Sequence, residues 1–283
     1  MSGDDRARPA TLLEPIPAAG RTSSLLREIR TLSRDPAARR RECLAIAEGI
    51  HLALEALRDP SRIRSALVSP RILRTDEGRS IVADLIRGPF PARRVEDRLL
   101  ADLGDTESHQ GILLVVRRPL WSLKDLLPDP GPPLVLVACG VQDPGNLGAL
   151  ARVAEASWAS GLVCAGGGAD PFSPRSLRAS AGSLLRLPAI ESTNSLAAAA
   201  DLRSAGLRLV GASLRASAGY REEAMMGPLA IFIGSEAAGL PSSLEPALDA
   251  LVRIPMRDGV DSLNVAAAAA VLLFEAAARR GAR

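Results

Sequence analysis

The sequence predicts an α/β protein of two domains, and three observations lead to this expectation. Short apolar runs at residues 134–138, 161–165 and 229–233 alternate with segments of helical character, which is typical of a parallel sheet built from βα units. A cluster of prolines at residues 121–133 interrupts the alternating pattern. The chain of 283 residues is also long enough for two medium-sized domains, each with its own core.

The composition favours a cytoplasmic protein. Residues 1–10 are polar and charged, without the apolar segment of a signal peptide, and no apolar run approaches the roughly 18 residues that cross a bilayer. Cys43, Cys139 and Cys164 show no CxxC spacing, so buried free thiols are expected rather than a metal or redox site. We therefore expect no membrane partner and no metal.

The basic surplus lies in the first half of the chain. Residues 1–125 contain 22 Arg and Lys against 18 Asp and Glu, whereas residues 126–283 contain 13 against 14. Almost all basic side chains are Arg, which binds phosphate in a bidentate manner. Charge alone leaves two interpretations open, an acidic polymer as partner or an ordinary solvated surface. The same two interpretations apply to the run Arg39, Arg40 and Arg41.

The first half reads as a small α/β domain over residues 21–120. Residues 1–20 mix charge with prolines and lack periodicity, so a disordered leader is expected before it. The expected helices are residues 24–33, 36–56, 80–87 and 96–103, and the expected strands are 65–69, 93–95 and 111–116. Residues 121–133 then form a Pro-rich linker, because proline fixes φ and blocks helix formation.

The second half, residues 134–283, reads as a parallel-sheet domain. The expected strands are residues 134–138, 161–165, 189–190, 207–211 and 229–233, and the expected helices include 149–156 and one that contains Arg175 and Arg178. The tail begins with a strand end at 253–256 and a turn containing Gly259. Asp261 and Ser262 are expected to cap an alanine-rich helix from Ala266, which suits close packing against another element or chain.

A dinucleotide-binding fold is the obvious alternative for such a domain, and the glycine spacing argues against it. The fingerprint GxGxxG must stand directly between the first strand and its helix. The sequence GNLG at residues 145–148 does not supply it, and the triplet at 166–168 lacks the third spaced glycine. We therefore do not expect a nicotinamide cofactor.

Three motifs in the second half carry a specific resemblance. They are DPGNLG at 143–148 followed by Arg152, IFIGSE at 231–236 with GL at 239–240, and IPM at 254–256 through SLNV at 262–265. In this order they resemble the motifs of the SpoU (TrmH-type) RNA 2′-O-ribose methyltransferases of the SPOUT class. More weakly, residues 41–49 and 110–111 are similar to the RNA-binding domain that precedes the catalytic domain in the ribosomal RNA branch of that family.

The resemblance implies a fold, a cofactor and an assembly. In the family the C-terminal part forms a deep trefoil knot, S-adenosylmethionine binds within it, and two chains associate through this domain into a homodimer. Carried onto this sequence, the cofactor contacts are Ala212, Ser213, Gly234, Ile254, Met256 and Leu263. Main-chain groups at strand ends and turns are free to read the edge of an adenine, which agrees with these positions.

The resemblance also implies the catalytic residues. They are Arg152, with Asn146, Glu236, Ser262 and Asn264 around it. From the residues alone, Asn146, Ser262 and Asn264 could equally be helix caps, and Glu236 a charge at a helix N-terminus. A guanidinium is a poor base, because its pKa lies above about 12. We therefore expect Arg152 mainly to bind the substrate phosphate and the developing alkoxide.

The sequence thus predicts an S-adenosylmethionine-dependent enzyme that methylates a ribose 2′-hydroxyl, in ribosomal RNA rather than transfer RNA. The resemblance raises Arg39, Arg40 and Arg41 to predicted phosphate contacts, and adds Arg178 as a further RNA contact. DNA is not an expected partner. The alternatives are a transfer RNA enzyme, a ribosome resistance methyltransferase and a non-catalytic assembly factor with the same fold. Two departures from the family pattern, Cys139 and Asp261 in place of common acidic and Glu residues, affect positioning only.

Overall fold

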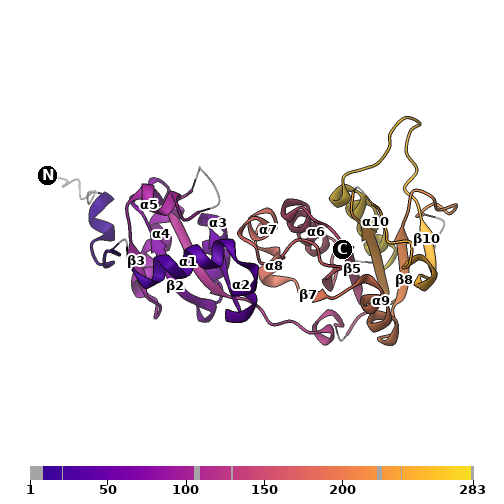
Figure 1. Cartoon of the computed structure of the whole chain (residues 1–283), viewed down its shortest axis with the longest axis horizontal. Coiled ribbons are helices and arrows are strands. Elements are labelled where there is room, and N and C mark those ends of the chain that lie inside the picture. Colours follow the sequence, from indigo (N-terminus) through magenta and orange to yellow (C-terminus); the bar gives the residue numbers. More distant parts are fainter. Residues whose placement is uncertain are drawn as a thin grey trace. The chain divides into compact units, whose positions relative to one another are not determined.

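The computed structural model describes residues 9–20, 22–104, 109–128, 130–221, 225–236 and 238–281. The chain divides into two compact units (Figure 1). The first consists of Met1–Arg118 with Phe172–Arg178, and the second of Pro119–Pro171 with Ala179–Arg283. Each unit has its own sheet and its own buried apolar cluster.

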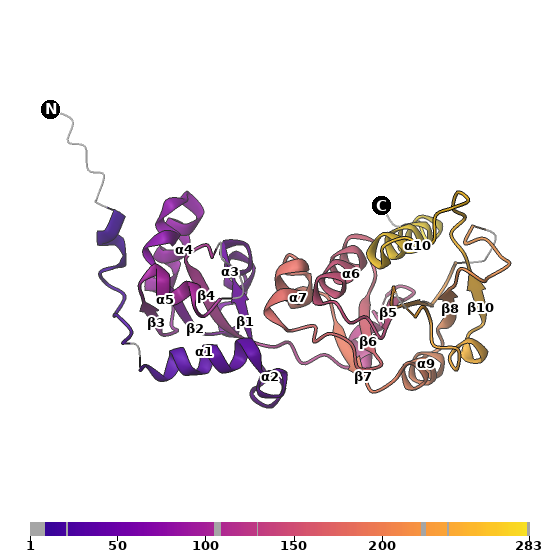
Figure 2. The same cartoon turned by 45° about the horizontal axis from the view of Figure 1, so that its top comes forward.

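The first unit is built on a four-stranded mixed sheet with the order β1-β4-β2-β3. Strand β4 is antiparallel to β1 and β2, and β3 is parallel to β2. Helix α1 covers one face through Leu26, Ile29 and Leu32, while α3 and α4 lie on the other face (Figure 2). The elements are η1 (Pro9–Leu13), α1 (Ser24–Arg34), α2 (Pro36–Glu42), β1 (Leu44–Glu48), α3 (Ile50–Leu57), η2 (Pro60–Arg62), β2 (Ile63–Val68), η3 (Pro70–Arg74), α4 (Asp76–Arg87), β3 (Ala92–Arg94), α5 (Asp97–Ala101) and β4 (Ile112–Arg117).

The single helix predicted over residues 36–56 is wrong. Helix α2 ends at Glu42, its C-cap Cys43 has a left-handed backbone with φ 53°, and Gly49 with φ 97° precedes α3. Between them the residues of β1 are all buried. A short apolar run that is buried on both faces has no periodicity that separates strand from helix, and this caused the error.

The predicted disordered leader does not extend over residues 9–20. Leu13 and Ile16 are each 2% exposed, and the amide of Ala19 donates a 2.9 Å hydrogen bond to the carbonyl oxygen of Arg94. Residues 1–8 lie outside the described part of the chain. Two buried apolar side chains thus hold this segment on the first unit despite its prolines.

The second unit is built on a six-stranded sheet with the order β10-β8-β9-β5-β6-β7, in which every pairing is parallel. The predicted parallel-sheet domain is therefore confirmed. Figure 2 shows α6 and α10 on one side of this sheet and α9 on the other. The elements are η4 (Leu123–Leu126), β5 (Leu134–Cys139), α6 (Pro144–Ala156), β6 (Gly161–Ala165), α7 (Pro174–Ala179, most of which groups with the first unit), α8 (Ser183–Arg186), β7 (Ala189–Ser192), α9 (Ser195–Ser204), β8 (Arg208–Ala212), β9 (Leu229–Gly234), η5 (Glu245–Ala247), β10 (Ala250–Val252) and α10 (Val265–Arg279).

The Pro-rich segment is more ordered than a linker. Residues 123–126 form η4, which begins with a capping box between Ser122 and Asp125. Leu126 is fully buried in the core of the second unit, beside strands β5 and β6. Prolines therefore exclude a long helix here, but they do not prevent packing.

No helix in the described residues is long and apolar enough to cross a membrane.

Candidate active site

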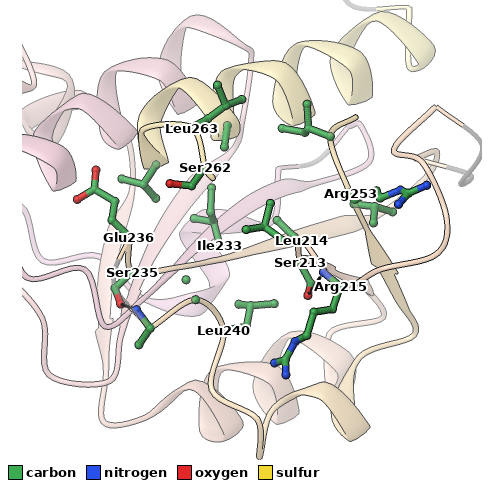
Figure 3. A pocket seen from close by; sticks show the side chains of 18 of the residues that line it. Ser213, Leu214, Arg215, Ile233, Ser235, Glu236, Leu240, Arg253, Ser262 and Leu263 are labelled. Carbon is green, nitrogen blue, oxygen red and sulfur yellow. Dashed lines mark hydrogen bonds between the residues drawn. The ribbon is translucent and has the colours of Figure 1, made fainter. Parts of the chain in front are cut away.

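A pocket of about 370 Å³ lies at the carboxyl ends of β8, β9 and β10 (Figure 3). Ligand sites in parallel sheets form at this edge, because the strands end there and the loops begin. The volume falls in the range of roughly 300–1,000 Å³ that is usual for small-molecule sites. Its walls come from the loop after β8, the loop after β9 and the segment that joins β10 to α10.

All residues predicted to bind the cofactor line this one pocket. They are Ala212, Ser213, Gly234, Ile254, Met256 and Leu263. These positions are far apart in the sequence, and the parallel order of β10, β8 and β9 brings them together. The structure therefore gives the predicted contacts a common location, and binding by each residue stays a prediction.

Gly234 ends β9 at a point with no room for a side chain. A Cβ here would lie 2.0 Å from the carbonyl carbon of Gly239 and 2.3 Å from the backbone nitrogen of Leu240. The chain folds back at this point, because the amide of Gly239 donates a 2.8 Å hydrogen bond to the carbonyl oxygen of Ser235. At Gly234 the pocket wall is therefore bare backbone, which suits a ligand that is recognised by the polar edge of a base.

Glu236, Asn146 and Asn264 form a hydrogen-bonded cluster, called the amide–carboxylate cluster below. Asn146 Nδ2 donates to Glu236 Oε2 at 2.9 Å, and Asn264 Nδ2 donates to Glu236 Oε1 at 2.9 Å. Asn264 Nδ2 also lies 3.1 Å from Asn146 Oδ1. The cluster joins α6, the loop after β9 and the start of α10, and both carboxylate oxygens are held by side chains distant in sequence.

Asn146 does not cap its helix. Helix α6 begins at Pro144, five residues before the predicted start, and Asp143 is its N-cap, with Asp143 Oδ1 accepting a 2.9 Å hydrogen bond from the amide of Asn146. The side chain of Asn146 is therefore left for Glu236. The alternative that Asn146 serves as a cap is excluded by this geometry.

The cap of α10 is Asn264, which confirms one of the two interpretations of this residue, and the predicted cap at Asp261 and Ser262 is wrong. Asn264 Oδ1 accepts from the amides of Ala266 at 2.9 Å and Ala267 at 3.4 Å. Its amide nitrogen bonds the cluster, so one side chain both begins the helix and holds Glu236. Ser262 lines the pocket, and Figure 3 shows its hydroxyl on the side where Glu236 lies.

Arg152 is exposed on α6 and does not join the amide–carboxylate cluster. Within the part of the chain that the structure describes, its guanidinium makes no hydrogen bond or ion pair. Of the predicted catalytic residues, the fold thus brings together Asn146, Glu236 and Asn264, with Ser262 on the adjoining pocket wall. Arg152 stands free to contact a substrate.

The predicted RNA-binding arginines have different surroundings. Arg39 is 4% exposed, and its Nη1 donates to the carbonyl oxygen of Leu32 at 2.6 Å, which argues against a phosphate contact. Arg40 and Arg41 are exposed at the end of α2, where Arg41 pairs with Glu42 at 3.0 Å. Within the first unit, Arg178 forms an ion pair of 3.3 Å with the buried carboxylate of Glu48.

Cys43, Cys139 and Cys164 all carry free thiols. Cys139 is buried at the end of β5. Burial raises the pKa of its thiol to about 11, although a hydrogen bond with the Ser195 side chain lowers this pKa in part. Burial also raises the pKa of the Cys164 thiol well above its usual range. Both thiols are therefore protonated at neutral pH. Among the described residues, no group of three or more His, Cys, Asp or Glu could hold a metal ion.

Several pocket residues were not predicted as contacts. Ser235 and Leu240 belong to the second motif and Arg253 to the tail, but none of the three was given a role, and Leu214, Arg215 and Glu245 were not singled out at all. Arg215 follows the end of β8 by three residues, and ligand-binding side chains of parallel sheets cluster at such ends, so its position was a usable indication. Glu245 lies in a short 3₁₀ helix, and nothing in its sequence context indicated the pocket.

Two family models match the chain. The model described as the SpoU rRNA Methylase family matches residues 133–274. The model described as RNA 2′-O ribose methyltransferase substrate binding matches residues 46–121. The two matches fall on the second and first halves of the chain, respectively.

Curated relatives and solved structures are similar over most of the chain. The 23S rRNA (guanosine(2553)-2′-O)-methyltransferase RlmP of Bacillus subtilis is 33% identical, over 81% of this chain and 86% of the relative. The 23S rRNA (guanosine-2′-O-)-methyltransferase RlmB of Vibrio cholerae is 31% identical, over 82% and 96%. The crystal structure of an AdoMet-bound rRNA methyltransferase from Sinorhizobium meliloti has a TM-score of 0.78 and 29% identity, over 93% of this chain and 97% of that one.

Proposed function

Because the chain belongs to the SpoU rRNA Methylase family, we propose that it transfers a methyl group from S-adenosylmethionine to a ribose 2′-hydroxyl of ribosomal RNA. The family predicted from the three motifs is confirmed, and so is its cofactor, since solved relatives contain AdoMet. The observation that carries the proposal is the amide–carboxylate cluster beside a pocket at the carboxyl ends of β8, β9 and β10. That combination provides a cofactor site and a rigid polar site next to it.

In this reaction the residues of the chain mainly position the ribose and stabilise the charge that develops on its oxygen. S-adenosylmethionine supplies an electrophilic methyl group on a sulfonium, so the protein has to align the ribose oxygen and assist removal of its proton. Glu236 is fixed by Asn146 and Asn264, which gives a preorganised negative group at the pocket. Ser262 adds a hydroxyl on the same side. These groups hold the reacting ribose in one orientation.

We assign Arg152 to the RNA phosphate and to the alkoxide that develops on the ribose. Its exposure on α6 supports this role, because a guanidinium that pairs with none of the described residues is available to an anion. Single-turnover rates of Arg152→Lys and Arg152→Ala test the assignment. We expect Lys to restore only part of the rate, since an ammonium lacks the bidentate fork. Full restoration, with a pH profile that follows the lysine, would instead show that residue 152 removes the proton.

Ribosomal RNA is the proposed substrate class because the relatives named above are 23S rRNA enzymes and the first half matches a substrate-binding family model. On that first unit we propose Arg40 and Arg41 as phosphate contacts, since both are exposed. Arg39 is no longer part of this proposal, and Arg178 contributes only if RNA displaces Glu48. We place the reaction in the cytoplasm, where the ribosome is assembled.

We further propose that the tail from β10 to α10 forms a trefoil knot and that two chains associate through the second unit. The sheet order supports the first idea, because α10 packs against α6 and β9 although β10 lies at the far edge. The second is supported by Phe274, a large apolar side chain that is 45% exposed on α10. A chain truncated at Gly259 should lose both dimer formation and cofactor binding. A truncated chain that keeps both would contradict this proposal.

Incubation with tritiated S-adenosylmethionine and total RNA tests the function. We expect label in ribosomal RNA, at a 2′-O-methylated nucleotide that resists alkaline cleavage. Label in transfer RNA would support the transfer RNA alternative. Cofactor binding without label in any RNA would support a non-catalytic assembly factor. The intact amide–carboxylate cluster favours the enzyme, because a binding protein has no need of a fixed carboxylate at the cofactor pocket.

A further inference from the structure

Helix α1 of the first unit carries a row of exposed arginines, called the basic stripe below. The stripe consists of Arg27, Arg30 and Arg34. At 3.6 residues per turn these positions fall within about 60° of the helix circumference and extend over about 10 Å. The apolar face of α1 is buried on the sheet, so the stripe is directed to solvent. Neither family model that matches the chain includes this helix.

The arginines of the basic stripe have no acidic partner. No residue three or four positions from any of them in the sequence is acidic. Within the described residues, their guanidinium groups make no hydrogen bond or ion pair. Glu28 is the one acidic residue of α1, and its Oε1 lies 3.1 Å from Arg64 Nε on β2. The three positive charges of the stripe are therefore not compensated by other side chains.

Arginines elsewhere in the first unit differ from the stripe, because four of them form an ion pair with an acidic residue three positions earlier in the chain. These pairs are Arg58 with Glu55, Arg62 with Asp59, Arg79 with Asp76, and Arg87 with Asp84. By contrast, the stripe places like charges three and four residues apart, and such spacings destabilise a helix slightly. The stripe therefore does not help α1 to fold, and a bound polyanion is the better explanation for it.

We propose that the basic stripe binds the phosphate backbone of the substrate RNA and extends the contact proposed for Arg40 and Arg41. Helix α2, which carries those two residues, begins one residue after α1 ends and packs against it (Figure 2). Guanidinium groups about one helical turn apart can each bind the oxygens of a different phosphate. Such contacts add affinity and fix the orientation of the RNA, but they do not read its sequence. This inference rests on the proposed function, and the stripe takes no part in methyl transfer.

Binding of purified 23S ribosomal RNA to the full chain, measured by filter binding over a series of salt concentrations, tests the inference without a methylation assay. Each phosphate contact contributes about 0.7 to 0.9 to the slope of log K against log salt. The triple variant Arg27→Gln, Arg30→Gln and Arg34→Gln should therefore lower the slope by about 2 to 3 and weaken binding about 100-fold at about 0.15 M salt. Arg30→Gln alone should give about one third of the change in slope.

Two further measurements separate RNA binding from folding and catalysis. The melting temperature of the triple variant should not fall, because the three side chains are exposed and their charges repel one another. In single-turnover methylation the triple variant should need more RNA for its half-maximal rate, and it should reach the wild-type rate at saturating RNA.

The matched control combines Arg58→Gln, Arg62→Gln and Arg87→Gln. It removes three charges from the same unit, but from arginines that are already paired with an acidic residue. The control should keep the wild-type slope and affinity. A stripe variant with the wild-type slope would overturn the inference and leave the stripe to an acidic protein surface. Equal losses in the stripe and control variants would also overturn it, because net charge alone would then explain the binding. A wild-type chain that does not bind ribosomal RNA would overturn the proposed function together with this inference.

Discussion

The amide–carboxylate cluster and the contacts of Arg39 with the end of α1 each join separate segments through one charged side chain. The two charged side chains differ in exposure and in partners. Glu236 is exposed and is held by the side-chain amides of Asn146 and Asn264. Arg39 is buried, and it donates to the carbonyl oxygens of Leu32 and Ser33 at the end of α1. The buried charge of Arg39 is bonded to backbone carbonyl groups and stabilises the fold. The exposed charge of Glu236 is held in place by other side chains and remains accessible to a ligand.

Removal of Glu236 should have the largest effect on function. We expect Glu236→Ala to lower the methylation rate about 100-fold, which is the usual cost of one preorganised electrostatic group in an active site. Its melting temperature should change little, because the residue is exposed. Single-turnover methylation and thermal denaturation measure the two effects.

Glu275→Ala is the control for Glu236→Ala. Glu275 is also a glutamate whose carboxylate is bound by another side chain, since its Oε1 lies 2.7 Å from Arg279 Nε on α10. It should change neither rate nor melting by much. A Glu236→Ala variant with the wild-type rate would show that the cluster is only structural, and the comparison would then fail.

Removal of Arg39 should affect stability rather than RNA. Arg39→Ala leaves the carbonyl oxygens of Leu32 and Ser33 without their buried donor, and we expect a loss of about 2 kcal/mol in the free energy of unfolding. Arg40→Ala, at the exposed neighbour, should cost less than about 0.5 kcal/mol. Urea unfolding measures both, and RNA affinity at fixed salt should fall for Arg40→Ala but not for folded Arg39→Ala. The reverse order of RNA affinities would contradict the structural assignment of Arg39.

Removal of Asp143 should have the smallest effect. It should affect both stability and the methylation rate, because Asp143 caps a helix and also supports Asn146 of the amide–carboxylate cluster. Asp143 caps α6 by accepting from the amide of Asn146, so Asp143→Ala should cost about 1 kcal/mol of stability. The methylation rate should fall a few-fold, because Asn146 loses part of its support. Asp143→Ser keeps a capping oxygen and should recover most of both. A normal rate in Asp143→Ala would show that Glu236 alone positions Asn146.

The parallel sheet and the pocket were predictable, for different reasons. The apolar runs of β5, β6 and β9 are bounded by glycines and polar turns, and this local sequence pattern predicts buried strands. By contrast, the meeting of Ile254 with Ala212 and Gly234 depends on strand order, which no local pattern encodes. That part of the site came from the resemblance of three motifs.

The errors of prediction occurred where long-range packing overrides local pattern. Residues 44–48 are apolar enough for either helix or strand, and pairing with β4 decides for strand. Arg39 looked like its two neighbours, but α1 packs over it and buries it. Asp261 and Ser262 are good capping residues, yet Asn264 caps the helix through its Oδ1 while its amide nitrogen bonds Glu236. Each outcome required knowing which segments meet.

The division into two units has a spectroscopic consequence. The two tryptophans, Trp121 and Trp158, and the one tyrosine, Tyr220, all belong to the second unit. Intrinsic fluorescence therefore reports unfolding of the second unit alone, whereas far-ultraviolet circular dichroism reports both. Coincident melting curves would indicate that the units unfold together, and separated curves would resolve their individual stabilities in one unlabelled sample.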